Sequence, residues 1–296
     1  MKKTLFGVLA TIVFVTFIAS CTEDNPYEDL SDGDITASIG GFDENGATQS
    51  TFSIGAGRKV HFSRGNLQYQ ASTNTWRFAS EQYYCVGNEN NNASATYAGW
   101  IDLFGFGCSG WNCGFQCFQP YSTSDNSQHY INKELTGDYR DADWAWHNMV
   151  TNGGERRNLW RTMSIDEWEY LMVHRQNAFS KKGLATIDGK FKGMVLLPDE
   201  WVQPSGLTFT PGFNGFTNNN YSIDEWHTME NSGAVFLPAA GGRTNVSTIQ
   251  VGSTGRYWTT SLDGENGVSR TFNSTSDGTF RGAGRFAGFS VRPVKD

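Results

Sequence analysis

The chain has 296 residues, and its 30 acidic residues outnumber the 23 lysines and arginines, which gives a formal charge of −7 at neutral pH. An acidic chain without a cluster of basic residues lacks the electrostatic footprint of nucleic-acid binding and of electrostatic attachment to membranes. Aromatic residues make up 14% of the chain beside 34 glycines, so we expect many short strands and tight turns around aromatic packing.

The first 20 residues have the pattern of a secretory signal peptide. Two lysines near the start precede an apolar stretch over residues 5–18, which is too short to span a membrane stably. The sequence IASC at 18–21 resembles a bacterial lipobox, whose cysteine is lipidated and becomes the first mature residue; an ordinary signal peptide with an incidental cysteine is the alternative. We therefore predict a signal peptide over 1–20 and a lipid anchor at Cys21 that attaches the protein to the outer membrane.

Residues 21–49 are predicted to form a flexible tether. After the cysteine, TEDNPYEDLSDGD is acidic and nearly devoid of apolar side chains, so it cannot bury enough surface to fold. An acidic run behind a lipidated cysteine also resembles the surface-export signal of Bacteroidetes lipoproteins, which implies display toward the cell exterior. We expect the remainder, residues 50–296, to form a single domain.

Four further cysteines stand at Cys85, Cys108, Cys113 and Cys117. In an exported protein such cysteines are usually paired, so we predict one or two disulfides that fasten the glycine-rich loop FGFGCSGWNCGFQC. Four cysteines allow three complete pairings, and the sequence does not select among them. Their spacing, with no histidine nearby, matches no zinc pattern, and no metal site is predicted.

Alternation of apolar and polar residues between turn residues predicts strands along most of the chain. Residues 85–128 lack such periodicity and are predicted to form a long irregular segment. The expected strands cover residues 59–62, 66–69, 76–78, 185–187, 191–197, 233–238, 255–261, 269–272 and 288–294.

Two helices are predicted from their start signals. Ser164 and Glu167 have the spacing of a capping box, in which each side chain bonds the backbone amide of the other residue. Trp168 and the apolar residues after it recur at three- and four-residue spacing, so one face of this helix packs on a core. Ser222 and Glu225 repeat the capping-box spacing. Since each polar residue of the first helix has a structural role, we interpret that helix as scaffolding.

Three sequence motifs together carry a family resemblance. RTMSIDEWEY at 161–170 resembles the helix motif of formylglycine-generating-enzyme-type (sulfatase-modifying) domains. LPAAG at 237–241 with GRYWTTS at 255–261 resembles the large paralogous domains of Bacteroidetes and Fibrobacter surface proteins, and GFSVR at 288–292 resembles the terminal strand of both groups. The resemblance implies a C-type lectin-like fold over roughly residues 50–296. That is an α+β domain with long irregular loops, mostly short antiparallel strands and few helices.

The functional residues of these families have few counterparts here. Formylglycine-generating enzymes use a pair of redox and copper-binding cysteines near the C-terminus, and this chain has none after Cys117. Lectins of this fold bind calcium through a Glu/Gln-Pro-Asn/Asp tripeptide and a later Trp-Asn-Asp. Gln203-Pro204-Ser205 and Trp258-Thr259-Thr260 stand in their place without a carboxylate. We therefore predict no catalytic residue and no cofactor, because the matched positions do not support calcium.

Other chemistry has only weak sequence signals. The chain contains no hydrolase, zinc-protease, nucleotide-binding or EF-hand motif, and its five histidines share no ligand spacing. A hydrolase with two opposed carboxylates is an alternative, although each candidate also suits a cap, a turn or the surface. The candidate carboxylates are Asp166, Glu167, Asp199, Glu200, Asp224 and Glu225.

Aromatic and amide side chains concentrate in residues 199–226, the segment in which the resembled fold presents its ligands. Aromatic rings stack on apolar faces, and amides supply paired hydrogen-bond donors and acceptors, which suits a sugar or a protein loop. Turn formation and core packing are the alternative roles for such residues. The predicted ligand-binding residues are Trp201, Gln203, Phe213, Asn214, Phe216, Asn218, Asn219, Asn220, Tyr221 and Asp224.

These observations lead to one main functional hypothesis. The chain is expected to be a non-enzymatic, cell-surface lipoprotein that binds an extracellular glycan or protein, with the membrane contacted through its lipid anchor and no nucleic-acid partner. One alternative is an enzyme, either a degenerate formylglycine-type oxidase or a carboxylate-dependent hydrolase. Another alternative is a structural component of a surface or fimbrial assembly.

Overall fold

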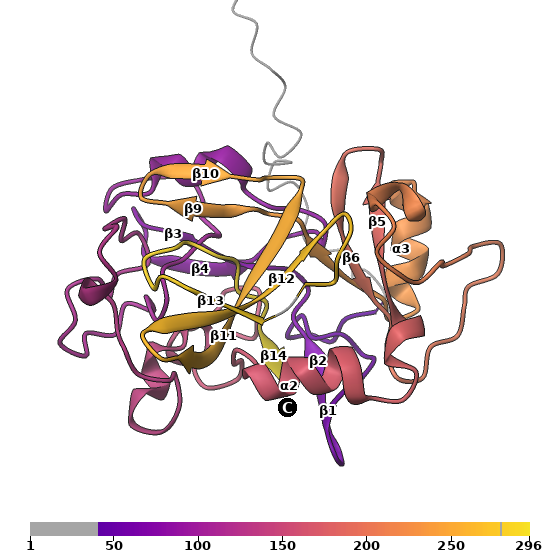
Figure 1. Cartoon of the computed structure of the whole chain (residues 1–296), viewed down its shortest axis with the longest axis horizontal. Helices are drawn as coiled ribbons and strands as arrows, with labels where there is room; N and C mark the ends of the chain where they lie inside the picture. Colours follow the sequence, from indigo (N-terminus) through magenta and orange to yellow (C-terminus); the bar gives the residue numbers. More distant parts are fainter. Residues whose placement is uncertain (1–40, 279) are drawn as a thin grey trace, which may run out of the picture.

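A computed structural model describes residues 41–278 and 280–296, which form an α+β structure of small, mostly antiparallel sheets with few helices (Figure 1). The strands are β1 (Phe52–Gly55), β2 (Arg58–Phe62), β3 (Leu67–Gln70), β4 (Thr75–Phe78), β5 (Lys182–Ile187), β6 (Phe191–Leu196), β7 (Asn220–Tyr221), β8 (Val235–Pro238), β9 (Gly242–Thr244), β10 (Ser247–Ile249), β11 (Thr254–Asp263), β12 (Asn266–Asn273), β13 (Phe280–Ala283) and β14 (Val294–Lys295). The helices are α1 (Trp144–His147), α2 (Ile165–Glu169), α3 (Ile223–Asn231), the π-helical turn η4 (Tyr170–His174) and the 3₁₀ turns η1 (Gly87–Asn92), η2 (Ser127–His129), η3 (Gly137–Ala142), η5 (Ala178–Lys181) and η6 (Phe216–Asn218).

The predicted signal peptide, the lipid-anchor residue Cys21 and the tether as far as residue 40 lie outside the described residues. Within the described part, none of the helices combines the length and the apolar character that a membrane crossing requires.

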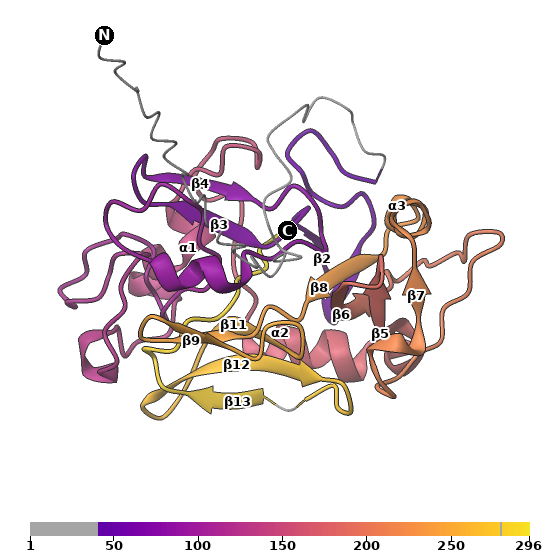
Figure 2. The ribbon, with the colours of Figure 1, turned by 90° about the horizontal axis from the view of Figure 1, so that it is seen from above.

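The sheets divide the structure into two sides. A four-stranded sheet with the order β7-β5-β6-β8 lies beside α3, and the β11-β12-β13 sheet and the β3-β4 hairpin lie on the other side (Figures 1 and 2). A third sheet, β1-β2-β14, pairs the last strand of the chain with one of the first, with Val294 opposite Phe62. The two ends of the described chain therefore lie close together.

Aromatic side chains form much of the core. The Trp258 ring lies 4.5 Å from that of Phe289, and its indole nitrogen donates to the carbonyl oxygen of Phe104 at 2.7 Å. Such buried rings contribute large apolar areas, and the bonded indole N–H avoids the cost of an unpaired polar group. Five tryptophans are almost fully buried: Trp144, Trp160, Trp168, Trp226 and Trp258. Trp258 of the GRYWTTS motif is therefore a packing residue.

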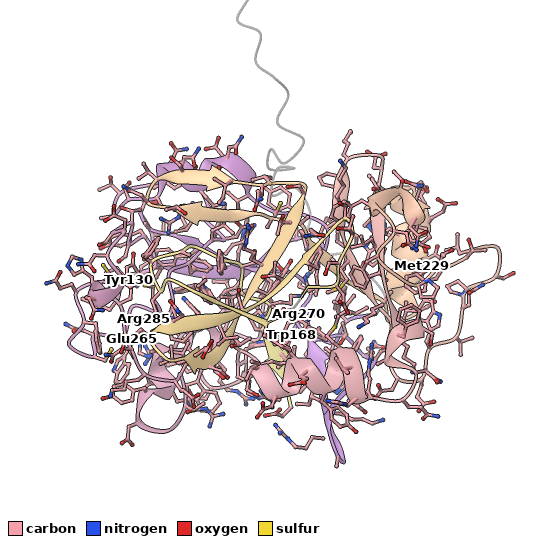
Figure 3. All side chains as sticks on the ribbon, viewed as in Figure 1. Tyr130, Trp168, Met229, Glu265, Arg270 and Arg285 are labelled. Atoms are coloured by element: carbon pink, nitrogen blue, oxygen red, sulfur yellow. The ribbon has the colours of Figure 1, made fainter. Side chains whose placement is uncertain are left out.

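The prediction of helices starting after Ser164 and Ser222 is confirmed. In both α2 and α3 the serine hydroxyl accepts from the backbone amide three residues on, and the glutamate at that position bonds back to the serine amide. On α2, Trp168 packs 6.0 Å from the ring of Phe62 in β2, so the helix covers the sheet that joins the chain ends (Figure 3). Its role as scaffolding agrees with this packing.

The predicted strand over residues 288–294 is wrong in part. The backbone there forms isolated bridges, with Gly288 opposite Arg243, Phe289 opposite Phe104 and Ser290 beside Tyr257. Only β14 at its end is a regular strand. Successive residues pair with different segments, so no continuous ladder forms. The other predicted strands overlap observed ones, and residues 85–128 are irregular apart from the short η1 and η2.

The folded part begins before the predicted boundary at residue 50. Ala47 is 1% exposed within the core and its backbone bridges that of Ser63, and the Thr48 hydroxyl accepts from the Phe62 amide at 3.0 Å. The Asp43 carboxylate accepts from the Ala47 amide and forms an ion pair with Lys295 in β14. Residues 41–49 are therefore part of the folded structure and not of a tether. Asp43 is held there by its bonds with Ala47 and Lys295.

We expect Ala47→Glu to lower the free energy of unfolding by about 3–5 kcal/mol, because the new carboxylate is buried without a partner. Gln49→Glu introduces the same side chain two residues later at an exposed position and should change stability by less than about 0.5 kcal/mol. Urea unfolding followed by tryptophan fluorescence measures both values. Equal, near-zero effects would mean that residues 41–49 are a tether after all.

Candidate ligand-binding cavity

The buried residues of the predicted ligand segment have structural roles. Phe216 and Tyr221 are 7% and 5% exposed and pack in the core. The Asn219 side chain accepts from the Thr210 amide at 2.7 Å and donates to the carbonyls of Leu184 and Thr210, each at 2.8 Å. These bonds use both ends of the amide, so Asn219 fastens the loop to β5.

The remaining residues of that segment do not meet in one site. Trp201 and Phe213 are half-buried against different core clusters. Gln203, Asn218 and Asn220 donate to backbone carbonyls of their own loop, at 2.9, 3.1 and 2.8 Å, and Asn214 and Asp224 are exposed. Most of these residues therefore hold the loop in shape, and none of the ten lines the cavities of about 330 and 340 Å³.

A cavity of about 330 Å³ lies on the other side of the structure, between the β3-β4 hairpin, the irregular segment before residue 122 and the turn after α1. Its lining combines phenol rings, amides, an imidazole and a guanidinium. The lining residues are Tyr69, Ala71, Asn74, Ala95, Ser109, Gly110, Gln119, Tyr121, His147, Asn148 and Arg157.

The β3-β4 hairpin positions one wall of this cavity. Tyr69 stacks against Trp76 across the hairpin with ring centroids 4.7 Å apart, and its backbone exchanges two hydrogen bonds of 2.9 Å with Ile101. Its hydroxyl donates to the Asn74 side chain at 3.1 Å. Asn74 has a φ of 51° in the turn, a left-handed conformation that asparagine tolerates better than most residues. The turn therefore presents an amide beside a fixed phenol ring.

The turn after α1 positions a second wall. The Asn148 amide donates to the carbonyls of Ser109 and Trp144 at 2.7 and 2.9 Å, which fastens the irregular segment to the helix. Both donors are thereby used, so the remaining hydrogen-bonding capacity of this amide is that of an acceptor. Burial and the nearby Arg157 lower the pKa of His147 below its ordinary value, while Asp141 opposes the shift. The imidazole is therefore neutral at neutral pH.

Burial raises the pKa of Tyr69, and the neighbouring Tyr121 adds to the shift, so this phenol stays protonated. No aspartate or glutamate is among the residues that line the cavity in the described structure. The cavity thus offers two aromatic rings and mostly neutral hydrogen-bonding groups, with Arg157 as its positive charge. This is a surface suited to an uncharged polar molecule.

A second cavity, of about 340 Å³, lies at the start of α2 beside the RTMSIDEWEY motif. Most of its charged groups are paired with each other: Arg161 contacts Glu167 at 2.8 Å and Asp296 at 2.6 Å, and Arg58 also contacts Glu167, whereas Arg140 lies over the Trp146 ring. Asp143 accepts from the backbone and the hydroxyl of Thr162 at 2.7 and 2.8 Å. These carboxylates serve as structural partners of the motif.

The carboxylates considered for a hydrolase also have partners. Glu167 and Glu225 close the two capping boxes. Asp199 accepts from the Ser53 hydroxyl at 2.6 Å and from Arg175 at 3.5 Å. Burial raises the pKa of Asp199, but the hydrogen bonds from Ser53 and the charges of Arg175 and Lys59 outweigh it and lower the pKa below its ordinary value. Glu167, Glu225 and Asp199 thus act as caps or ion-pair partners, and the other three candidates, Asp166, Glu200 and Asp224, are exposed.

The predicted disulfides are absent, and all four cysteines of the described residues are free thiols. Cys85 lies in the core cluster next to β6 and β8, away from the glycine-rich loop. Cys108 is fully buried, and its thiol donates to the carbonyl oxygen of Cys117 at 3.0 Å. The loop is held by backbone bonds instead, such as that from the Cys117 amide to His129 at 2.9 Å.

The residues that line the cavity were not predicted from the sequence. Tyr69 and Asn74 have the pattern of an ordinary strand and turn, and Tyr121 lies in the segment predicted only to be irregular. The density of aromatic, amide and glycine residues in 109–121 was an available signal, of the same kind that drew attention to residues 199–226. Only the tertiary structure shows which of the two segments surrounds a cavity.

Comparisons with protein-family models, with curated proteins and with solved structures each gave no match. The geometry of the cavity and the sequence motifs are thus the basis for a functional proposal.

We expect iodoacetamide to label Cys113 and Cys117 in the folded protein and to label Cys85 and Cys108 only after unfolding. Burial raises the pKa of Cys85 and Cys108 and makes both thiols inaccessible to the reagent. Cys113 and Cys117 are half-buried, so the reagent can reach them. Peptide mapping by mass spectrometry identifies the labelled sites. Peptides cross-linked through any pair of these cysteines would contradict the thiol assignment.

Proposed function

We propose that this chain is a non-enzymatic binding module that contacts a glycan through the cavity between the β3-β4 hairpin and α1. The observation that carries the proposal is the lining of that cavity, with Tyr69 and Tyr121 beside the amides of Asn74, Gln119 and Asn148. The half-buried Tyr121 ring supplies a face that stacks on a sugar ring, and the amides bond sugar hydroxyls, with Asn148 as an acceptor only because both of its N–H groups are already used.

The size of the cavity is consistent with one or two sugar residues. Its volume of about 330 Å³ lies at the lower end of the range of about 300–1,000 Å³ for small-molecule sites. Paired-acid hydrolysis requires two carboxylates at the scissile bond, and a hard cation such as calcium requires several oxygen ligands. Since the lining within the described residues has no carboxylate, binding of a sugar is favoured over both paired-acid hydrolysis and calcium binding.

We extend the proposal to the fold and the location of the protein. The α+β arrangement is assigned to the C-type lectin-like class, supported by the pairing of β2 with β14 near the chain ends and by the long irregular segment that lines the cavity. The lipobox-like sequence ending at Cys21 supports lipid anchorage in the outer membrane, and the acidic run after it supports display toward the cell exterior.

We expect Tyr121→Ala to weaken binding of the glycan at least tenfold, because the variant loses a stacking surface of the cavity. A glycan array identifies the ligand, and isothermal titration calorimetry with that glycan measures the affinity. Trp201→Ala is the matched control: it also removes an aromatic ring, but from the segment that the sequence favoured, and it should leave affinity unchanged.

A loss of affinity in Trp201→Ala but not in Tyr121→Ala would show that the ligand binds at residues 199–226 and not in the cavity. If no glycan on the array binds and one protein is captured saturably from host or bacterial surface extracts, the ligand is a protein and not a glycan. Silence in both experiments would remove the support for a binding module.

We expect Cys21→Ser to release the protein from the membrane fraction, because the substitution removes the atom that carries the lipid. Detergent phase partition of cells expressing each form measures the change, and Cys113→Ser controls for loss of a thiol as such. Protein that stays in the detergent phase after Cys21→Ser, or wild-type protein in the aqueous phase, would show that lipid at Cys21 is not the anchor.

A further inference from the structure

Three potential metal ligands lie together at the side of the structure that carries α3. One ligand atom from each of Glu81, His227 and Glu230 lies within 4.8 Å of the other two. His227 and Glu230 are three residues apart on α3, on one face of that helix, next to Met229, which Figure 3 labels. Glu81 comes from the loop that follows β4 and lies 146 residues from His227 in the sequence.

Glu230 is the informative member of this cluster. The residue is 3% exposed, and its Oε2 atom has no hydrogen-bond partner among the described residues. A buried carboxylate oxygen without a partner is costly, and native structures usually satisfy such groups with protein, water or an ion. Burial, opposed by a hydrogen bond with Gln82, raises the pKa of Glu230 to about 7. Glu81 adds to this rise, whereas His227 and the buried Arg292 oppose it, so Oε2 is the one oxygen of this carboxylate without a hydrogen-bond partner.

The loop that carries Glu81 is fixed by its next residue. The Gln82 side-chain carbonyl accepts from the Phe236 amide at 2.9 Å and from Arg292, and its amide donates to the Ala234 carbonyl at 3.1 Å. Gln82 itself is fully buried. Ala234 just before β8 and Phe236 within it therefore hold the loop in place, which supports the position of Glu81 before any ligand arrives.

The separation of the ligand atoms suits a small divalent cation. The Nε2 atom of His227 lies 3.3 Å from the Oε2 atom of Glu81. In a tetrahedral zinc site, metal–ligand bonds of about 2.0–2.2 Å place neighbouring ligand atoms about 3.3–3.5 Å apart. The side chains of His227 and Glu81 are 31% and 20% exposed, so one side of the cluster is open for a water ligand. The main opposing feature is the buried Arg292 nearby, whose charge repels a cation.

We propose that Glu81, His227 and Glu230 form a binding site for a divalent cation of the zinc class. One imidazole and two carboxylates favour borderline metals such as zinc, whereas calcium prefers six to eight oxygen ligands. The cation neutralises the buried Glu230 and links the loop after β4 to α3. A surface pair elsewhere, His174 and Glu169 at 3.7 Å, has the same residue types without a buried third ligand and is not part of the proposal.

The test is a titration of the full-length, chelator-treated protein, purified without a histidine tag, with zinc chloride in a calorimeter. We expect one zinc per chain, with His227→Ala and Glu230→Gln each lowering the affinity at least tenfold. His174→Ala is the matched control and should bind zinc as the wild type does. Calcium chloride should give no comparable binding.

A thermal-unfolding series separates metal binding from misfolding of a variant. Zinc should raise the unfolding midpoint of the wild type and of His174→Ala, since the cation binds the folded state, and should leave that of His227→Ala unchanged. Glu230→Gln also removes the anionic neighbour of the buried Arg292, so its midpoint without zinc should fall, and zinc should not raise it.

Zinc affinity that His227→Ala leaves unchanged would overturn the proposal, as would the absence of binding to the wild type. Because free cysteines also bind zinc, the Cys113→Ser, Cys117→Ser double variant is included. It should retain the zinc affinity of the wild type, and a loss of binding in that variant would assign the metal to the glycine-rich loop instead.

Discussion

The buried guanidinium of Arg292 is the polar contact that ties together separate parts of the core on which the rest of the fold is built. It is 1% exposed and donates to the Gln82 side chain and to the Phe236 carbonyl at 3.2 Å, with Asn66 at 3.5 Å. Burial lowers the pKa of Arg292 to about 10, so the group is still charged at neutral pH. A buried charge is tolerated only where several acceptors surround it. The acceptors of Arg292 come from three separate parts of the chain, which therefore have to meet for the fold to be stable.

This constraint connects the core to both functional proposals. Gln82, which Arg292 fixes, immediately follows Glu81, so the same buried contact that joins the end of the chain to β8 also sets the loop against α3. On the other side, the irregular segment around the cavity is fixed by Tyr69, Asn148 and the core residue Trp258, whose indole bonds the carbonyl of Phe104. The groups offered to ligands thus come both from regular elements, such as Tyr69 in β3 and His227 in α3, and from irregular segments that the core holds in place.

The motifs that stand out in the sequence are parts of that scaffold. Trp168 and Trp258 are buried, Glu167 closes a capping box and binds two arginines, and Arg292 ends the GFSVR motif in the core. The proposed sites use less conspicuous residues, and they lie apart: the β3-β4 hairpin and α1 are on one side of the structure and α3 is on the other (Figure 2). Ligand binding in the cavity and cation binding at α3 can therefore be tested independently of each other.

The sequence by itself determined the features that depend on neighbouring residues. The capping boxes at Ser164 and Ser222, most strands and the burial of tryptophans follow from local spacing and polarity, and they were predicted correctly. Only the tertiary structure decided that the chain folds from before residue 50, that residues 288–294 are mostly not a strand and that the four cysteines are thiols. It also decided that the cavity lies away from residues 199–226 and that Glu81 meets His227 across 146 residues. The reason is physical: local signals act through the next few residues, whereas a cavity or a cation cluster is made by segments whose distance in space the sequence spacing does not encode.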